Sequence, residues 1–432
     1  MIKSTRTLLL KIEKALFYAV TLSIPFNLGK HFVLESSYVY GKLLDYLIPT
    51  IFIQDILIFF LILVSLPKLL KFLTISIKYW EFALLTLFIA SLILSICTAA
   101  FPIASWYFLI RLLLYMLFGF YIFSQVNILK ELPTSLKIFS FLLLFQSILG
   151  LAQWLNQGSV FNNYLFFGEQ PYSMTTPQIV RVPFGGVTRV PPYGTFRHPN
   201  VLAGFLSFCI VFILGLHPKK FYFYLPILPG IICLLLTSSR LGMLSCFLGI
   251  SLLILPKKFI KPFSIFTLMS CLIFTIYMWV YPNLPAFLLV ENFATDPSFY
   301  RRRNLFLIGW ELFRGNPLYG IGLNNFMYYV DKISISLSLP KFTQPIHNVF
   351  LLFLVESGAF AFFLLISFFT LLLEKTFSHF QNPASGRYSR LFLVLFISFL
   401  PALFFDHFLL TSQQMLLVFC LTTALALQYN LK

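Results

Sequence analysis

The chain consists largely of apolar runs of about 20 residues that alternate with short polar connections. A helix of that length spans the roughly 30 Å hydrocarbon core of a bilayer. Hydrophobic residues make up 59% of the sequence and charged residues 10%, which is more apolar surface than a water-soluble core buries. We therefore expect an all-α, polytopic integral membrane protein with about twelve transmembrane helices. The apolar runs cover 8–28, 46–66, 80–100, 103–123, 136–155, 199–216, 221–237, 241–256, 263–281, 346–373, 391–409 and 411–429.

The basic residues indicate how these runs are oriented. The chain has 31 Lys and Arg against 14 Asp and Glu, and most of the lysines stand in every second connection. Basic connections are retained in the cytoplasm, so we expect both termini to be cytoplasmic and the two longest connections to face outward. No basic stripe with interleaved aromatic residues lies outside the runs, so the charge predicts contact with anionic membrane lipid and not with nucleic acid. The basic connections contain Lys68, Lys71, Lys78, Lys130, Lys137, Lys219, Lys220, Lys257, Lys258, Lys261, Lys375, Arg387 and Arg390.

Two long connections hold most of the Pro, Gly, Asn and Arg residues, so we expect function to reside there. In the second, Asp296 and Pro297 are typical of a helix start, and Gly315, Asn316 and Pro317 of a helix end. The sequence between them predicts an amphipathic helix along the outer interface. The chain is thereby divided into N-terminal spans 1–155, a first outer loop 156–198, central spans 199–281, a large outer loop 282–345 and C-terminal spans 346–432.

Cysteine usage and the N-terminus point to a membrane protein without disulfides. The basic start followed by an apolar run to Leu28 lacks a small-residue cleavage site, so we interpret it as an uncleaved first span. The cysteines all fall inside apolar runs without metal-binding spacing, and we expect them to be small membrane-buried residues. They are Cys97, Cys209, Cys233, Cys246, Cys271 and Cys420.

Arg240 stands between two apolar runs with almost no loop around it. An arginine near the membrane costs about 3 kcal/mol unless it is paired, so we expect a partner. One interpretation is that the side chain reaches lipid phosphate. The other is a bound anionic substrate, with Thr237, Ser238 and Ser239 as further donors.

Arg197 and His198 close the first outer loop, within Gly194-Thr195-Phe196-Arg197-His198-Pro199-Asn200. This stretch is typical of a helix start, and it also fixes two side chains at the membrane surface that are able to bind substrate. His347 holds a similar place at the end of the second loop. It is either a structural histidine or a group that takes a proton from a reacting hydroxyl or binds a phosphate.

Other ionisable residues lie within or at the edges of the runs, and we assign none of them a catalytic role. Arg111 is expected to pair with an acid such as Asp55. The sequence contains no phosphate-binding loop, no His-Glu-x-x-His, no Asp-x-Asp and no Gly-x-Ser-x-Gly motif, so we expect neither metal nor cofactor. The remaining residues of this kind are Glu81, Glu356, Asp406 and His407.

Taken in order, these motifs resemble the O-antigen ligase and polymerase superfamily of bacterial membrane glycosyltransferases. The resemblance covers roughly residues 190–360 by motif and the whole chain by its pattern of spans. One departure is that the aromatic residue a turn after Arg302 is Phe306, where the family often has Trp, which leaves the choice among Arg301, Arg302 and Arg303 open. The matching residues are Gly194 to Asn200, Thr237 to Arg240, Arg302, Asn316 to Leu323, His347, Asn348, Glu356 and Gly358.

The resemblance implies a metal-independent enzyme in the bacterial cytoplasmic membrane. It would transfer a glycan from a polyprenyl-diphosphate carrier to a glycan, lipid or protein acceptor at the outer face. Arg240 and Arg302 would then hold the diphosphate, and His347 would act at the acceptor hydroxyl or assist donor binding. A polymerase of lipid-linked repeat units is the alternative within the family. A transporter or flippase is the alternative from another class.

Overall fold

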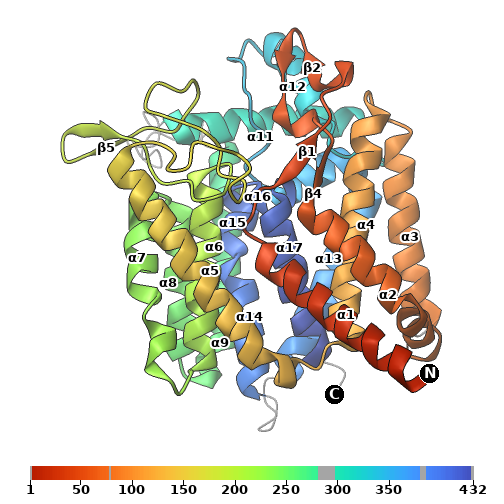
Figure 1. The fold of residues 1–432 in the computed structure, drawn as a ribbon. Coiled ribbons are helices and arrows are strands. Elements are labelled where there is room, and N and C mark those ends of the chain that lie inside the picture. The colour runs from red at the N-terminus through yellow and green to blue at the C-terminus, as the bar shows by residue number, and fades with distance from the viewer. Residues whose placement is uncertain (1, 77–78, 281–296, 380–385, 430–432) are drawn as a thin grey trace.

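The structure is a computed structural model, and it describes residues 2–76, 79–280, 297–379 and 386–429. Most of these residues form a helical bundle, with short strands and two further helices gathered at one end (Figure 1). Six helices of the described residues are long and apolar enough to cross a membrane, and five shorter apolar helical segments lie beside them. The expectation of a helical, polytopic membrane protein is confirmed.

Helices occupy all the predicted apolar runs, although several boundaries differ. The first run is α1 (Ile2–Ser23), and the run predicted at 46–66 is α2 (Ile53–Ser76). The run predicted at 391–409 is divided among three short helices. The others are α3 (Tyr79–Ile96), α4 (Pro102–Gln125), α5 (Ile128–Asn156), α6 (Pro199–Leu216), α7 (Ile227–Leu236), α8 (Arg240–Ile254), α9 (Lys257–Val280), α13 (Val349–His379), α14 (Gly386–Ser398), α15 (Leu400–Phe405), α16 (Phe408–Thr411) and α17 (Gln413–Tyr429).

The start of α1 and the end of α17 lie at the same end of the bundle (Figure 1). The contacts of α17 identify this end and the opposite one. At the start of α17, the Gln413 amide donates a hydrogen bond to Asn27, just after α1. At the other end of α17, Gln428 donates to the carbonyl oxygen of Phe123 at the end of α4. The end with Asn27 also carries α11, α12 and the strands (Figure 1). We refer to it as the loop end.

The prediction that a span begins at residue 46 is wrong. Residues 29–52 instead form a small folded segment at the loop end. There β1 (Gly29–His31) pairs antiparallel with β4 (Thr50–Phe52), and β2 (Tyr38–Val39) pairs with β3 (Lys42–Leu43). Two 3-10 turns, η1 (Glu35–Ser37) and η2 (Asp45–Leu47), complete it. Leu47, Ile48 and Phe52 are buried, whereas Ile51 is exposed, so the apolar stretch at 46–52 belongs to this segment and not to a membrane span.

The first long connection also contains short secondary structure. Strands β5 (Val182–Phe184) and β6 (Val187–Arg189) form a hairpin, and the 3-10 turn η3 (Phe221–Tyr224) lies between α6 and α7. The turn before α6 is fixed by amide side chains from neighbouring helices. Gln146 of α5 donates to the Thr195 hydroxyl at 2.8 Å, and Gln414 of α17 donates to the Thr195 carbonyl at 3.3 Å. In a membrane such bonds replace the water that the backbone lacks.

The amphipathic helix expected in the second loop is α11 (Pro297–Gly315), and its predicted limits are confirmed for the described residues. It runs across the loop end of the bundle (Figure 1). Leu305, Ile308 and Leu312 are buried beneath it, whereas Arg301 is exposed. The shorter helix α12 (Phe326–Ser336) follows.

Helix α13 is broken at Gly358, whose φ of +80° is not helical. The preceding turn of the second loop packs into this break. Backbone N–H groups of Ile321 and Gly322 donate to the carbonyls of Val355 and Glu356, both at 3.0 Å. The Glu356 carboxylate accepts from the Asn324 backbone at 2.9 Å. The Gly320-Ile321-Gly322 stretch and Glu356 therefore have a structural role, because they join the second long connection to α13.

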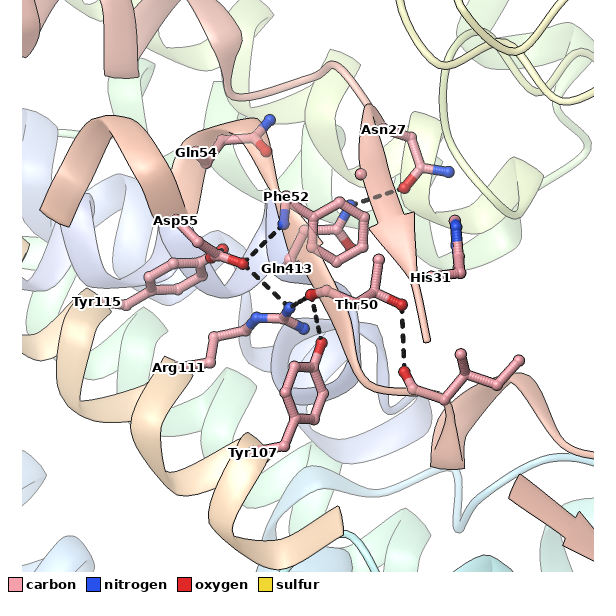
Figure 2. Close-up of polar contacts among 12 residues, drawn as sticks. Asn27, His31, Thr50, Phe52, Gln54, Asp55, Tyr107, Arg111, Tyr115 and Gln413 are labelled. Carbon is pink, nitrogen blue, oxygen red and sulfur yellow. Dashed lines mark hydrogen bonds and ion pairs between the residues drawn. The ribbon is translucent and has the colours of Figure 1, made fainter. Parts of the chain in front are cut away.

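The predicted pair of Arg111 and Asp55 is confirmed, with 3.1 Å between guanidinium and carboxylate. The two side chains lie between α2 and α4 (Figure 2). Asp55 also accepts hydrogen bonds from the Phe52 backbone and from the Tyr115 hydroxyl, both at 2.9 Å. Arg111 in turn donates to the Thr50 carbonyl of β4. The ion pair thereby fixes the folded segment 29–52 to the bundle.

We expect Asp55→Asn and Arg111→Gln each to destabilise the protein in nanodiscs by about 3 kcal/mol, because each leaves one charge or donor buried without its partner. The double variant should lose less than the sum of the two, with a coupling free energy of about 1–3 kcal/mol. Thermal unfolding measures this. Glu311→Gln is the control, since its ion pair with Arg314 is exposed. Additive losses would show that the two side chains are not coupled.

Candidate functional site

His347 lies at the loop end, where the second long connection enters α13. Its position is fixed by Asn348, whose side chain accepts from the Leu351 backbone at 2.9 Å and donates to the Phe404 carbonyl at 3.0 Å. The first contact caps α13 and the second ties it to α15. The His347 ring consequently packs edge to face against His407, with 5.1 Å between ring centroids.

Asp406 links α6 to the segment between α15 and α16. One carboxylate oxygen accepts from the Asn200 side chain of α6 at 2.9 Å, and the other accepts from the His407 backbone at 2.7 Å. The His407 ring nitrogen Nδ1 is 2.7 Å from the Thr411 hydroxyl. Asp406 is only 4% exposed, so its charge is stabilised by these donors and by nearby cations.

Two arginines of α11 extend this cluster. Arg302 and Arg301 both lie close enough to lower the pKa of His347, and Arg302 also lowers the pKa of Asp406. The Arg302 guanidinium donates to the Ser298 hydroxyl at 2.7 Å within its own helix. Arg303 contacts Asn304. Of the arginines left open by the sequence, Arg301 and Arg302 are thus those with an electrostatic effect on the histidine.

His198 belongs to the same cluster. It caps α6, with its ring Nδ1 accepting from the Asn200 backbone at 3.1 Å. Asp406 and Arg301 both affect its pKa. We define the cluster of His198, His347, Asp406 and His407 with Arg301 and Arg302 as the loop-end site.

The electrostatics of the site keep its imidazoles neutral. Burial, together with the neighbouring His407, lowers the pKa of His347 to about 3. Burial lowers that of His198 to about 4. Among the described residues, the buried Nδ1 of His347 has no hydrogen-bond partner. A ring nitrogen that the protein does not engage is available to a ligand, as donor or acceptor according to the tautomer.

Asp406, unlike the histidines, is kept in its charged form. Burial opposes its ionisation, but the facing His407, His347 and His198 and the Arg302 guanidinium outweigh this and lower its pKa. The carboxylate is therefore charged at neutral pH. It raises the pKa of His347 relative to burial alone, so it favours an imidazolium whenever His347 takes up a proton.

Arg240 is the first residue of α8 and is exposed. Two of the three hydroxyls predicted as further donors beside Arg240 are bonded to backbone groups instead. Thr237 donates to the Leu234 carbonyl at 2.6 Å, and Ser239 accepts from the Gly242 backbone as the helix cap. Helix α8 packs against α15, whose C-terminal cap is Asp406. A shared ligand of Arg240 with the loop-end site remains a prediction.

Arg197 points away from the loop-end site, although it precedes His198 directly. Its guanidinium is 3.1 Å from the His31 ring nitrogen Nε2 of β1 and 5.7 Å from the centre of the Phe52 ring. The structure thus separates two residues that the sequence placed together.

Sequence reasoning did not assign functional roles to Asp406 and His407, and it did not consider His31. An Asp-His pair at the interruption between two apolar runs was the available signal for the first two. No such signal marked His31, because its position depends on the folded segment 29–52. No group of three or more His, Cys, Asp or Glu suited to a metal ion occurs in the part of the chain described.

Comparison with protein-family models gives a match over residues 225–366, to the family described as O-Antigen ligase. This range contains Arg240, Arg302 and His347. Residues 225–366 are thus similar to the O-antigen ligase family model. No individually curated protein matches the chain.

The range that matches the O-antigen ligase family does not contain the whole loop-end site. His198 precedes it, and Asp406 and His407 follow it in the chain. The site is completed because Asn200 and Asn348 bind the end of α15 from both sides. Residues outside the matched range therefore contact His347 and affect its pKa, through the ring of His407 and the charge of Asp406.

We expect acid to destabilise the folded protein between pH 7 and 5. His347 and His198 have lowered pKa values when folded, whereas unfolded histidines titrate near 6.5, so the unfolded state binds more protons in this window. Asp406 titrates below it. Thermal unfolding in nanodiscs should show a drop in Tm from pH 7 to 5 that is smaller in His347→Gln. An equal drop in that variant would exclude a buried neutral His347.

Proposed function

We propose that this protein transfers a glycan from a polyprenyl-diphosphate carrier to an acceptor at the outer face of the bacterial cytoplasmic membrane. The observation that carries the proposal is a neutral His347 with an unengaged Nδ1, beside Arg302, within an O-antigen ligase domain. A base next to cations suits a reaction in which a hydroxyl loses a proton and a diphosphate departs.

In this proposal Arg240 and Arg302 hold the diphosphate. A polyprenyl diphosphate keeps its tail in lipid and its phosphates at the interface, where guanidinium groups at helix starts reach them. Arg302 stands in the first turns of α11 and Arg240 at the start of α8. Charge stabilisation of the departing diphosphate would be the main contribution to catalysis.

His347 would act as general base on the acceptor hydroxyl. The acceptor oxygen forms a bond to the anomeric carbon as the bond from that carbon to the carrier phosphate breaks. The proton passes to His347, and polyprenyl diphosphate leaves. Asp406 would stabilise the resulting imidazolium, and His198 would contact the substrate from the start of α6.

We further propose that the reaction is metal-independent, because guanidinium groups would take the role of a divalent cation at the diphosphate. The proposal also requires the loop end to face outward. About twelve spans with both termini cytoplasmic meet this requirement, and the lysine-rich connections support that orientation.

We expect Arg240→Ala or His347→Ala to lower glycan transfer by at least about 100-fold, with protein abundance and membrane insertion unchanged. Transfer of a labelled glycan from its lipid carrier in membrane vesicles measures this. Arg314→Ala and His217→Ala are controls, because both side chains are exposed and lie outside the loop-end site. Normal transfer in both test variants would discard the site assignment.

A polymerase of lipid-linked repeat units would use the same chemistry, with a second repeat unit as acceptor. Supplying labelled lipid-linked repeat distinguishes the two. A ligase gives one shifted acceptor band, whereas a polymerase gives a ladder. Transport is the weaker alternative, since the polar residues gather at one end of the bundle and not at its midplane.

A further inference from the structure

Arg197 is a cation without a counter-ion in the described structure. Two arginines flank the Phe52 ring, with Arg111 at 4.8 Å and Arg197 at 5.7 Å from its centre. Arg111 is neutralised by Asp55. Arg197 forms no ion pair with a described carboxylate, and its buried Nε has no hydrogen-bond partner among the described residues. A half-buried guanidinium that lacks a counter-ion among the described residues is suited to binding an anion from outside the chain.

His31 lies next to Arg197 and offers a second hydrogen-bond donor without adding a second positive charge. Burial and the adjacent Arg197 lower the pKa of His31, so its ring is neutral. Its Nε2 then accepts from the Arg197 guanidinium at 3.1 Å. In that tautomer Nδ1 carries the proton and is a donor. The two side chains together offer cationic and neutral N–H groups.

The backbone explains why Arg197 serves a different place from the loop-end site. His198 is extended, with φ −151° and ψ 144°, and successive side chains of extended backbone point to opposite sides. His198 is directed toward Asp406, and Arg197 toward β1 and β4 (Figure 2 shows His31 and Phe52 there).

Tyr46 connects the two places. Its ring packs edge to face on His407 with 5.7 Å between centroids. Both Asp406 and Arg197 influence its pKa. A ligand reaching Arg197 is thus near the loop-end site without occupying it.

We propose that Arg197 and His31 form a second anion subsite, which binds a phosphate or carboxylate group of the acceptor while Arg240 and Arg302 hold the donor diphosphate. This inference rests on the proposed function. The acceptor would accordingly be a hydroxyl compound with an acidic group near the hydroxyl that is glycosylated.

The test is calorimetric titration of inorganic phosphate, and separately of acetate, into full-length protein in phosphatidylcholine nanodiscs saturated with undecaprenyl diphosphate. The saturated protein should bind one of these anions. Arg197→Gln should weaken that binding by about 10-fold or more, while affinity for undecaprenyl diphosphate changes less than about twofold. Arg302→Gln should show the reverse pattern. Arg181→Gln is the control, since this exposed arginine of the same loop binds only carbonyl groups in the described structure.

The outcomes separate the two proposals. No anion binding to saturated protein, or binding unchanged in Arg197→Gln, overturns the second subsite. So does a loss of undecaprenyl diphosphate binding in Arg197→Gln as large as in Arg302→Gln, which would assign Arg197 to the donor. Undecaprenyl diphosphate binding that is unaffected by Arg302→Gln contradicts the donor site instead. Arg197→Lys with thermal unfolding distinguishes a folding defect, because it retains the charge.

Discussion

The buried carboxylate of Asp406 is the interaction on which the loop end depends. It is almost inaccessible to water, yet it faces three imidazoles and a guanidinium and accepts two hydrogen bonds. A buried charge of this kind is stable only with such partners. Its partners come from α6, α11 and the start of α13, so the same charge that is stabilised also draws distant segments together.

Lipid explains why the polar contacts are so unevenly distributed. The bundle interior is packed with aromatic and aliphatic side chains, and many of its buried polar groups are amides and hydroxyls that donate to backbone carbonyls. Charged groups with catalytic potential are placed at helix starts at one end, where a lipid-linked substrate presents its phosphates. In the proposed function, this division would let one fold bind a carrier through its tail and its diphosphate at the same time.

Much of this arrangement could be predicted from the sequence, for physical reasons. Apolar runs of fixed length give the helices, and Pro297 and Gly315 give the limits of α11. The pair of Arg111 and Asp55 could be predicted because a charge within the membrane requires a partner of opposite charge. The segment 29–52 was not predicted, because its apolar strands have the same local composition as a span. The separation of Arg197 from His198 was equally hidden, since it depends on the extended backbone at one residue.

In the proposed function, Arg240, Arg302 and His347 share one ligand. Cryo-electron microscopy of the protein in nanodiscs with bound undecaprenyl diphosphate tests this most directly. We expect density for the diphosphate between the starts of α8 and α11, within hydrogen-bond distance of both guanidinium groups and beside His347. Diphosphate density elsewhere, or Arg240 and Arg302 on separate sides of the bilayer, would contradict it.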